Sequence, residues 1–151
     1  AVTGVGVTNG AMCTALFVEK FKPSAVIVSG TGSRFNPEVN CGDTIISKKT
    51  IHHAAGTLTS KGMIYRKVRG PLPGQMTHWA YPPDPILFKL AKRAVDSYQA
   101  EAVTADGKTY TPSVQPGVVS ASDFFGVSQA KINDMKKKLN PDLMEMESAA
   151  R

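Results

Sequence analysis

The sequence predicts a layered α/β fold. Segments with helical periodicity alternate along the chain with short apolar runs that are typical of strands. The run at residues 25–29 is continuously apolar, as expected of a strand that is buried on both faces of a parallel sheet. The 151 residues, of which 42% are apolar, suit one domain with one hydrophobic core.

The first half of the chain predicts one helix and two strands. Thr8 is a candidate cap for a helix over residues 8–21, and Pro23 ends it because proline cannot continue a helix. Residues 25–29 and 44–47 then follow as strands. The stretch at 56–84 is rich in Gly and Pro and predicts a long irregular segment, which is typical of a lid, an insertion or a partner-contacting loop.

The second half predicts two further helices. Asp84 is a good N-cap, Pro85 suits the first helical position, and apolar residues repeat at helical spacing as far as Tyr98. Residues 105–108 indicate a turn and residues 118–120 a strand. A last helix is predicted over residues 128–139, before Asn140-Pro141.

Charge and hydropathy argue against a nucleic-acid or membrane partner. The net charge is +6, but the lysines are spread along the chain and no aromatic residues interleave with a basic patch. The densest run, Lys136-Lys137-Lys138, is expected in the last turn of a helix, where cations suit the helix dipole and face water. No apolar run approaches the roughly 20 residues that span a bilayer.

The segment at residues 142–150 (DLMEMESAA) places two carboxylates around a methionine. Carboxylates among apolar residues are seldom buried without a partner, and a bound polyol would supply one. A carboxylate accepts hydrogen bonds from two adjacent hydroxyls, while a methionine packs on the apolar face of the same ring. Alternatively, Glu145 and Glu147 lie in water on an edge strand or a first helical turn.

Three segments together resemble the nucleoside phosphorylase and nucleosidase superfamily. They are residues 3–11 (TGVGVTNGA), residues 25–47 with AVIVSGTGS at their start and GDTIIS at their end, and residues 117–150 from GVVSASDFF to EMESAA. The resemblance covers nearly the whole chain. It implies a three-layer α/β/α domain with a mixed and mainly parallel sheet, of which residues 1–151 form a single domain that corresponds to the central part of the family domain.

The resemblance also implies a function, the cleavage of the N-glycosidic bond of a purine nucleoside similar to methylthioadenosine or adenosine. Water and phosphate both stay open as the attacking group, so phosphate is a candidate co-substrate. We expect no cofactor, no metal, and a homo-oligomer that is a dimer or a trimer. Such a reaction passes through an oxocarbenium-like sugar and requires a grip on the ribose, a face against the base, and proton transfer to the leaving base.

By the same resemblance, eight residues form the substrate site. Met146 lies under the ribose, Glu147 takes its hydroxyls with Glu145 nearby, and Phe124 stacks on the base. The remaining expected contacts are the backbone at Phe125 and the turn of Thr31, Gly32 and Ser33, where the missing side chain of Gly32 allows close approach.

The resemblance also implies a separate anion site at Gly4 and Gly6, since the glycine turn of the phosphorylases lies near the phosphate, where bare N–H groups can bind an anion. Simpler interpretations stay open: the two Gly residues form only a tight turn, and Phe124 and Phe125 are only core aromatics. His52 and His53 are expected to point to opposite faces of a strand, which argues against a shared metal.

The chain also departs from the family pattern. Ala121-Ser122 stands where the family has Gly-Asp, and Ser33-Arg34 stands where it has small residues. The family's general acid and its water-activating glutamate are expected outside residues 1–151. Two hypotheses follow, an enzyme of nucleoside cleavage, or a non-catalytic storage or nucleoside-binding relative, similar to plant bark and vegetative storage proteins, whose site has decayed.

Overall fold

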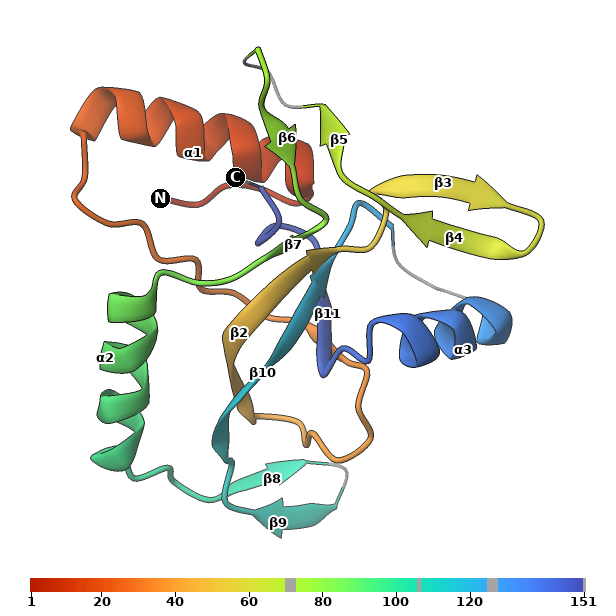
Figure 1. Ribbon diagram of the computed structural model, residues 1–151. Helices are drawn as coiled ribbons and strands as arrows, with labels where there is room; N and C mark the ends of the chain where they lie inside the picture. The colour runs from red at the N-terminus through yellow and green to blue at the C-terminus, as the bar shows by residue number, and fades with distance from the viewer. Residues whose placement is uncertain (70–72, 106, 125–127, 151) are drawn as a thin grey trace.

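The computed structural model describes residues 1–69, 73–105, 107–124 and 128–150 (Figure 1). Its three helices are α1 (Val7–Phe21), α2 (Pro85–Asp96) and α3 (Gln129–Lys138). Its strands are β1 (Ser33–Arg34), β2 (Thr44–His52), β3 (Gly56–Thr59), β4 (Gly62–Tyr65), β5 (Val68–Arg69), β6 (Met76–Thr77), β7 (Ala80–Tyr81), β8 (Val103–Ala105), β9 (Lys108–Tyr110), β10 (Val114–Ala121) and β11 (Leu143–Glu145).

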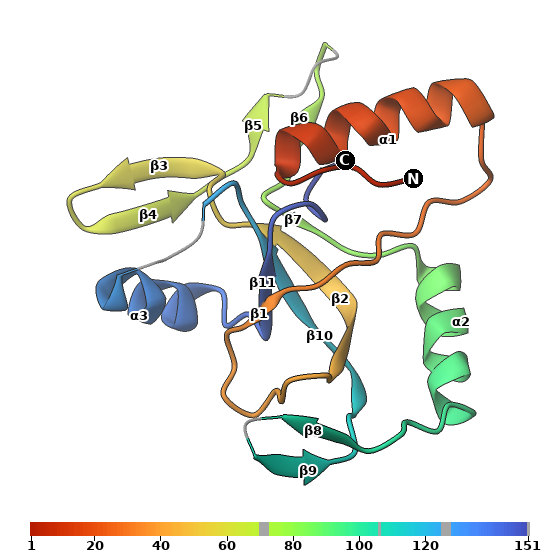
Figure 2. The same cartoon turned by 180° about the vertical axis from the view of Figure 1, so that it is seen from behind.

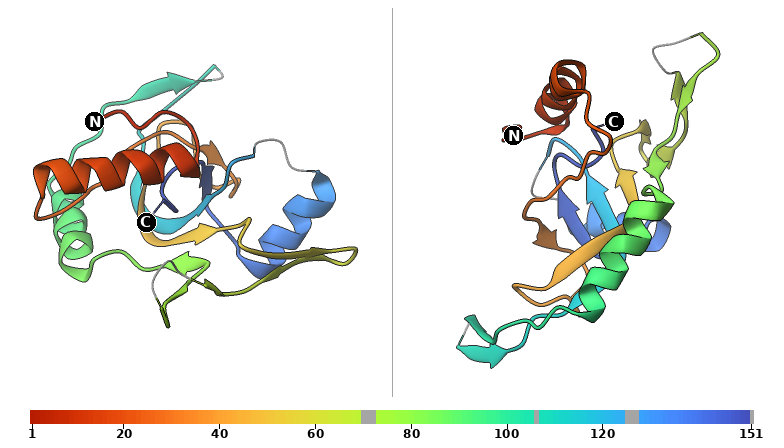
Figure 3. Two further views of the ribbon diagram at one scale, coloured as in Figure 1. Left: turned by 90° about the horizontal axis from the view of Figure 1, so that it is seen from above. Right: turned by 90° about the vertical axis from the view of Figure 1, so that its left-hand side faces the viewer.

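A central mixed sheet confirms the predicted α/β fold. Its strand order is β1-β11-β10-β2-β7, with β10 parallel to both β2 and β11 and with the edge strands β1 and β7 antiparallel to their neighbours. Opposite views place α2 and α3 on opposite sides of this sheet (Figures 1 and 2). Helix α1 lies across the end of the sheet at which β2, β10 and β11 finish (Figures 1 and 3).

The hydrophobic core lies between the sheet and α3. Ile51 from β2 and Val118 from β10 pack there against Met135 and Leu139, with both Ile51 and Met135 fully buried. Helix α2, in contrast, contributes no fully buried residue. No helix in the described part of the chain is long and apolar enough to cross a membrane.

Two of the predicted helices are confirmed, and each begins at a side-chain cap. The Asp84 side chain accepts hydrogen bonds from the N–H groups of Ile86 and Leu87, each at 2.9 Å, and Pro85 opens α2. The Ser128 hydroxyl accepts a hydrogen bond from the N–H of Lys131 and begins α3. These ends depend on local contacts, which explains why the sequence pattern located them.

Two predictions in the first quarter of the chain are wrong. Helix α1 starts at Val7 with Gly6 as its N-cap, so Thr8 does not cap it. Residues 25–29 form no strand and pair with no strand among the described residues, and the Ile27 side chain is 80% exposed. An apolar run predicts burial only when a neighbouring strand covers it, and here the sheet edge begins later, at β1.

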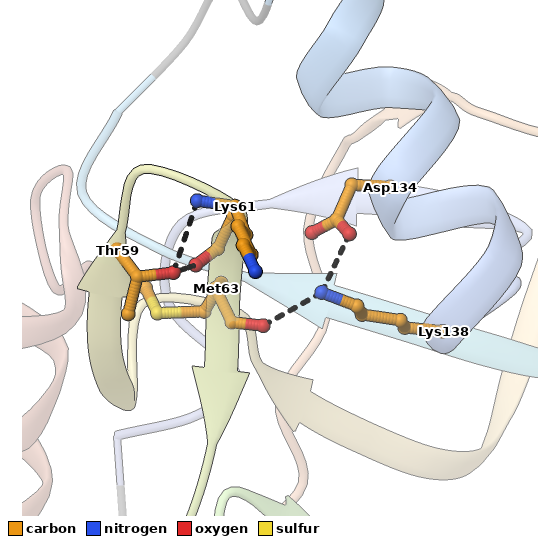
Figure 4. A network of polar contacts seen from close by, with 6 residues as sticks. Thr59, Lys61, Met63, Asp134 and Lys138 are labelled. Carbon is orange, nitrogen blue, oxygen red and sulfur yellow. Dashed lines mark hydrogen bonds and ion pairs between the residues drawn. The ribbon is translucent and has the colours of Figure 1, made fainter.

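The Gly- and Pro-rich stretch is more regular than predicted. It forms the hairpin β3–β4 and the two-stranded β5–β6, and its strand β7 pairs with β2 in the central sheet. Figure 4 shows how the first hairpin is held on α3. The Lys138 ammonium donates to the Met63 carbonyl at 2.8 Å and pairs with Asp134 at 2.6 Å. Lys138 therefore lies in the last helical turn, as predicted, but it contacts protein as well as water.

Asp142 joins three segments where β11 begins. Its carboxylate accepts hydrogen bonds from the Val118 N–H at 2.7 Å and from the Asn36 amide at 3.0 Å. Its backbone N–H donates to the Val118 carbonyl, and its carbonyl accepts from the N–H groups of Phe35 and Asn36. This residue therefore aligns β11 with β10 and brings the segment after β1 beside both.

We expect Asp142→Ala to lower the free energy of unfolding by about 1–3 kcal/mol, because the buried Val118 N–H loses its charged acceptor. Urea denaturation of the 151-residue chain measures this change. Asp96→Ala, at the exposed end of α2, is the matched control and should change stability by less than about 0.5 kcal/mol. Equal midpoints for the two variants would contradict this role of Asp142.

Candidate functional site

A cavity of about 360 Å³ lies at the carboxyl end of the parallel strands. Six of its lining residues are ones that the sequence predicted, and the seventh, Val5, was not predicted. The lining residues are Val5, Thr31, Gly32, Ser33, Glu145, Met146 and Glu147. Phe124 is not among them, and Phe125 falls outside the described residues.

Gly32 has a packing role that differs from the one expected. A Cβ atom at this position would lie 2.3 Å from the Leu143 side chain and 2.7 Å from the Met144 carbonyl. The missing side chain therefore lets the turn at residues 31–33 lie directly against β11. Because of this approach, Ser33 pairs with Met144 and the turn forms one wall of the cavity. Arg34, next to it in β1, is exposed and is not a lining residue.

The Glu145 carboxylate is used within its own turn. It accepts hydrogen bonds from the Glu147 N–H at 2.8 Å, from the Ser148 N–H at 2.9 Å and from the Ser148 hydroxyl at 2.7 Å. Its oxygens thus shape the turn that follows β11. Glu145 lines the cavity, but its carboxylate bonds to the backbone N–H groups of Glu147 and Ser148.

Glu147 and Asp123 both contact the start of α1. The N–H of Gly6 donates to Glu147 Oε1 at 2.8 Å, and the N–H of Val7 donates to Asp123 Oδ1 at 2.5 Å. These carboxylates replace the side-chain cap that α1 lacks, and negative charge at a helix N-terminus is favourable. Gly6 has a φ of 105°, and a Cβ atom there would lie 2.8 Å from Asp123 Oδ1, so this position requires glycine.

At the predicted anion site, two N–H groups donate to side chains of the chain itself. Gly4 and Gly6 both have positive φ and form the turn before α1, as expected. However, the N–H groups of Gly6 and Val7 donate to two carboxylates, and a phosphate at this place would meet both negative charges.

Phe124 lies beside His53. Their ring centroids are 5.1 Å apart and the ring planes meet at 86°, which is an edge-to-face contact. The Phe124 side chain is 42% exposed, so it is not a core aromatic.

Three polar side chains are buried where β2 and β10 end. His53, Ser120 and Ser122 are all essentially inaccessible, and His53 Nδ1 lies 2.9 Å from the Ser120 hydroxyl. Burial, and secondarily the neighbouring Lys131 and His52 charges, lower the pKa of His53 from 6.5 to about 4, so its ring is neutral at neutral pH. His52 is half-buried; burial lowers its pKa, and the Asp123 charge opposes this shift.

Sequence reasoning missed Val5, the cap supplied by Asp123 and the buried position of His53. Val5 lies between Gly4 and Gly6, so the glycine turn that the sequence singled out could have indicated it as a lining residue. The other two depend on contacts between residues far apart in the chain: 116 positions separate Val7 from Asp123, and 67 separate His53 from Ser120. No local pattern signals either contact.

Comparison with known proteins establishes the family. A family model described as the phosphorylase superfamily matches residues 1–150. The chain therefore belongs to the phosphorylase superfamily.

The matching relatives are longer than this chain. A 5′-methylthioadenosine/S-adenosylhomocysteine nucleosidase of Geobacillus sp. (strain WCH70) is 31% identical over 150 residues, which cover 98% of this chain and 56% of the relative. The crystal structure of the Neisseria meningitidis nucleosidase of the same name, in complex with methylthio-immucillin-A, is 26% identical with a TM-score of 0.72. It covers 99% of this chain, and the chain covers 58% of it.

A more distant structure supports the fold alone. The Helicobacter pylori futalosine hydrolase mutant is 17% identical, with a TM-score of 0.75 over 99% of this chain and 60% of that one. The chain thus spans somewhat more than half the length of the proteins that it matches.

The burial of neutral His53 predicts a pH dependence of stability. The unfolded chain takes up this proton near pH 6.5, whereas the folded chain resists it until about pH 4. Stability should therefore fall as the pH decreases from 6.5 toward 4, and this part of the loss should be absent in His53→Asn. Urea titrations of both chains across this window measure the difference, and parallel curves would contradict the assignment.

Proposed function

We propose that this protein cleaves the N-glycosidic bond of a purine nucleoside similar to methylthioadenosine or adenosine by hydrolysis. The proposal rests chiefly on the cavity that gathers Met146 and Glu147 opposite the turn at residues 31–33. The nucleosidases named above support it, since the chain matches them over almost its whole length.

Within this proposal, Glu147 holds the ribose. Its Oε1 accepts a hydrogen bond from the Gly6 N–H, and this contact orients the carboxylate. We assign the other oxygen, Oε2, to a sugar hydroxyl. Met146, beside it in the cavity wall, offers an apolar surface to the ribose ring. Phe124, half-exposed beyond the end of β10, is assigned to the face of the base.

Water is favoured over phosphate as the attacking group. The amides that begin α1 are the natural anion site of this fold region, and Glu147 and Asp123 occupy them. A phosphate would have to displace one carboxylate and lie near the other. The roles that we assign to the described residues concern the binding of the nucleoside, and we assign proton transfer to the leaving base to none of these residues.

The ribose grip is tested by calorimetry with adenosine and 2′,3′-dideoxyadenosine. The 151-residue chain should bind adenosine more tightly than it binds 2′,3′-dideoxyadenosine. Glu147→Gln should weaken adenosine binding by roughly 1–3 kcal/mol, because the charge-assisted hydrogen bonds to the sugar are lost. Glu19→Gln, an exposed glutamate on α1, is the control and should leave both affinities unchanged. Equal affinities of the unaltered chain for the two nucleosides would rule out a carboxylate grip.

The reaction is tested by product analysis with the purified protein and methylthioadenosine. Hydrolysis releases adenine and the free sugar at a rate that does not depend on phosphate, whereas phosphorolysis yields a sugar 1-phosphate and requires phosphate. Formation of the sugar phosphate would overturn the choice of water. Tight adenosine binding without any release of adenine would instead support the non-catalytic relative.

A further inference from the structure

We propose that His53 is a positioning residue for Phe124, holding the aromatic ring where it receives the base of the nucleoside. The inference rests on the proposed function for the role of Phe124, but the contact between the two rings is independent of it. His53 itself touches no ligand in this proposal.

His53 is fixed by contacts with β10. Its backbone N–H donates to the Ala121 carbonyl at 3.1 Å, which continues the pairing of β2 with β10 one residue beyond β2. Its Nδ1 lies 2.9 Å from the Ser120 hydroxyl, and the side chain has no exposed surface. A buried ring with both a backbone and a side-chain anchor has little freedom to turn.

Strand alternation explains why the ring lies where it does. Ile51 and His53 are two residues apart on and just after β2, and Val118 and Ser120 are two apart on β10. Ile51 and Val118 belong to the core beneath α3. His53 therefore extends this rigid core to the carboxyl end of the sheet, directly below Phe124.

Phe124 depends on this support. It lies beyond the last residue of β10 and is 42% exposed, and His53 is its aromatic neighbour in the described part of the chain. The perpendicular arrangement places the edge of one ring against the face of the other, which is favourable for aromatic pairs. A neutral histidine makes this contact without introducing a charge beneath the base site.

Other roles for His53 fit the contacts less well. Its hydrogen-bond partner Ser120 is also fully buried, so this serine and histidine cannot reach a substrate as a nucleophile and base. His52 ends β2 with the opposite orientation, so the two histidines do not converge on a metal.

The first test follows the Phe124 ring in the variant His53→Asn. Asparagine keeps a polar atom near Ser120 but removes the ring edge, and His52→Asn is the matched control one residue earlier. The Phe124 ring resonances of the ligand-free chain, followed by NMR with labelled phenylalanine, should shift toward those of an exposed phenylalanine in His53→Asn and stay in place in His52→Asn. Unchanged Phe124 resonances in His53→Asn would overturn the proposal, whatever the chain binds.

Calorimetry then connects the contact to the base. His53→Asn should weaken adenosine binding by roughly 2–10-fold, the range expected for one aromatic pair, and should leave the binding of base-free methylthioribose unchanged. In a chain that already carries Phe124→Leu, His53→Asn should cause little further loss. Independent losses in the double variant, or an equal loss for methylthioribose, would contradict the positioning role. If the Phe124 resonances shift in His53→Asn but the unaltered chain does not bind adenosine, the result contradicts the proposed function and not the contact between the two rings.

Discussion

The geometry of the site depends on the contact between Asp142 and Val118. Parallel strands cannot be joined by a tight turn, so contacts between the strands fix their register. The Asp142 carboxylate and backbone both bond to Val118, and from there β11 runs beside β10 until Glu145 pairs with Ala121. The same carboxylate accepts a hydrogen bond from Asn36 and so holds the chain after β1 next to the two strands.

A second constraint couples α1 to the cavity. The helix begins with N–H groups that have no partner within the helix, and Glu147 and Asp123 supply acceptors from the ends of two different strands. The attraction acts in both directions, because the helix N-terminus also stabilises the two ionised carboxylates. A ligand hydroxyl that binds the Glu147 carboxylate also acts on the first turn of α1.

The sequence predicted the elements whose signals are local. Helix α2 begins at Asp84-Pro85 and α3 begins after Ser128, as capping chemistry required. The prediction was wrong for residues 25–29, because an apolar run does not reveal whether a neighbouring strand covers it. It was also wrong for the cap of α1, where distant carboxylates took the role that a nearby Thr8 was expected to have. Neither the lack of a covering strand beside residues 25–29 nor the distant carboxylates at α1 leaves a local sequence signal.

The same distinction holds within the candidate site. The turn at residues 31–33 and the segment from Glu145 to Glu147 were predicted from motifs, and they line one cavity because the strands beside them end at one edge of the sheet. The motif did not indicate that Glu145 would bond to its own turn, nor that Gly32 was required by Leu143 and the backbone of β11. A glycine or a carboxylate in a motif therefore identifies a place in the fold more reliably than a contact with the ligand. Under the proposed function, the side chain that grips the sugar is Glu147, whose contact with the backbone of α1 uses one carboxylate oxygen, Oε1.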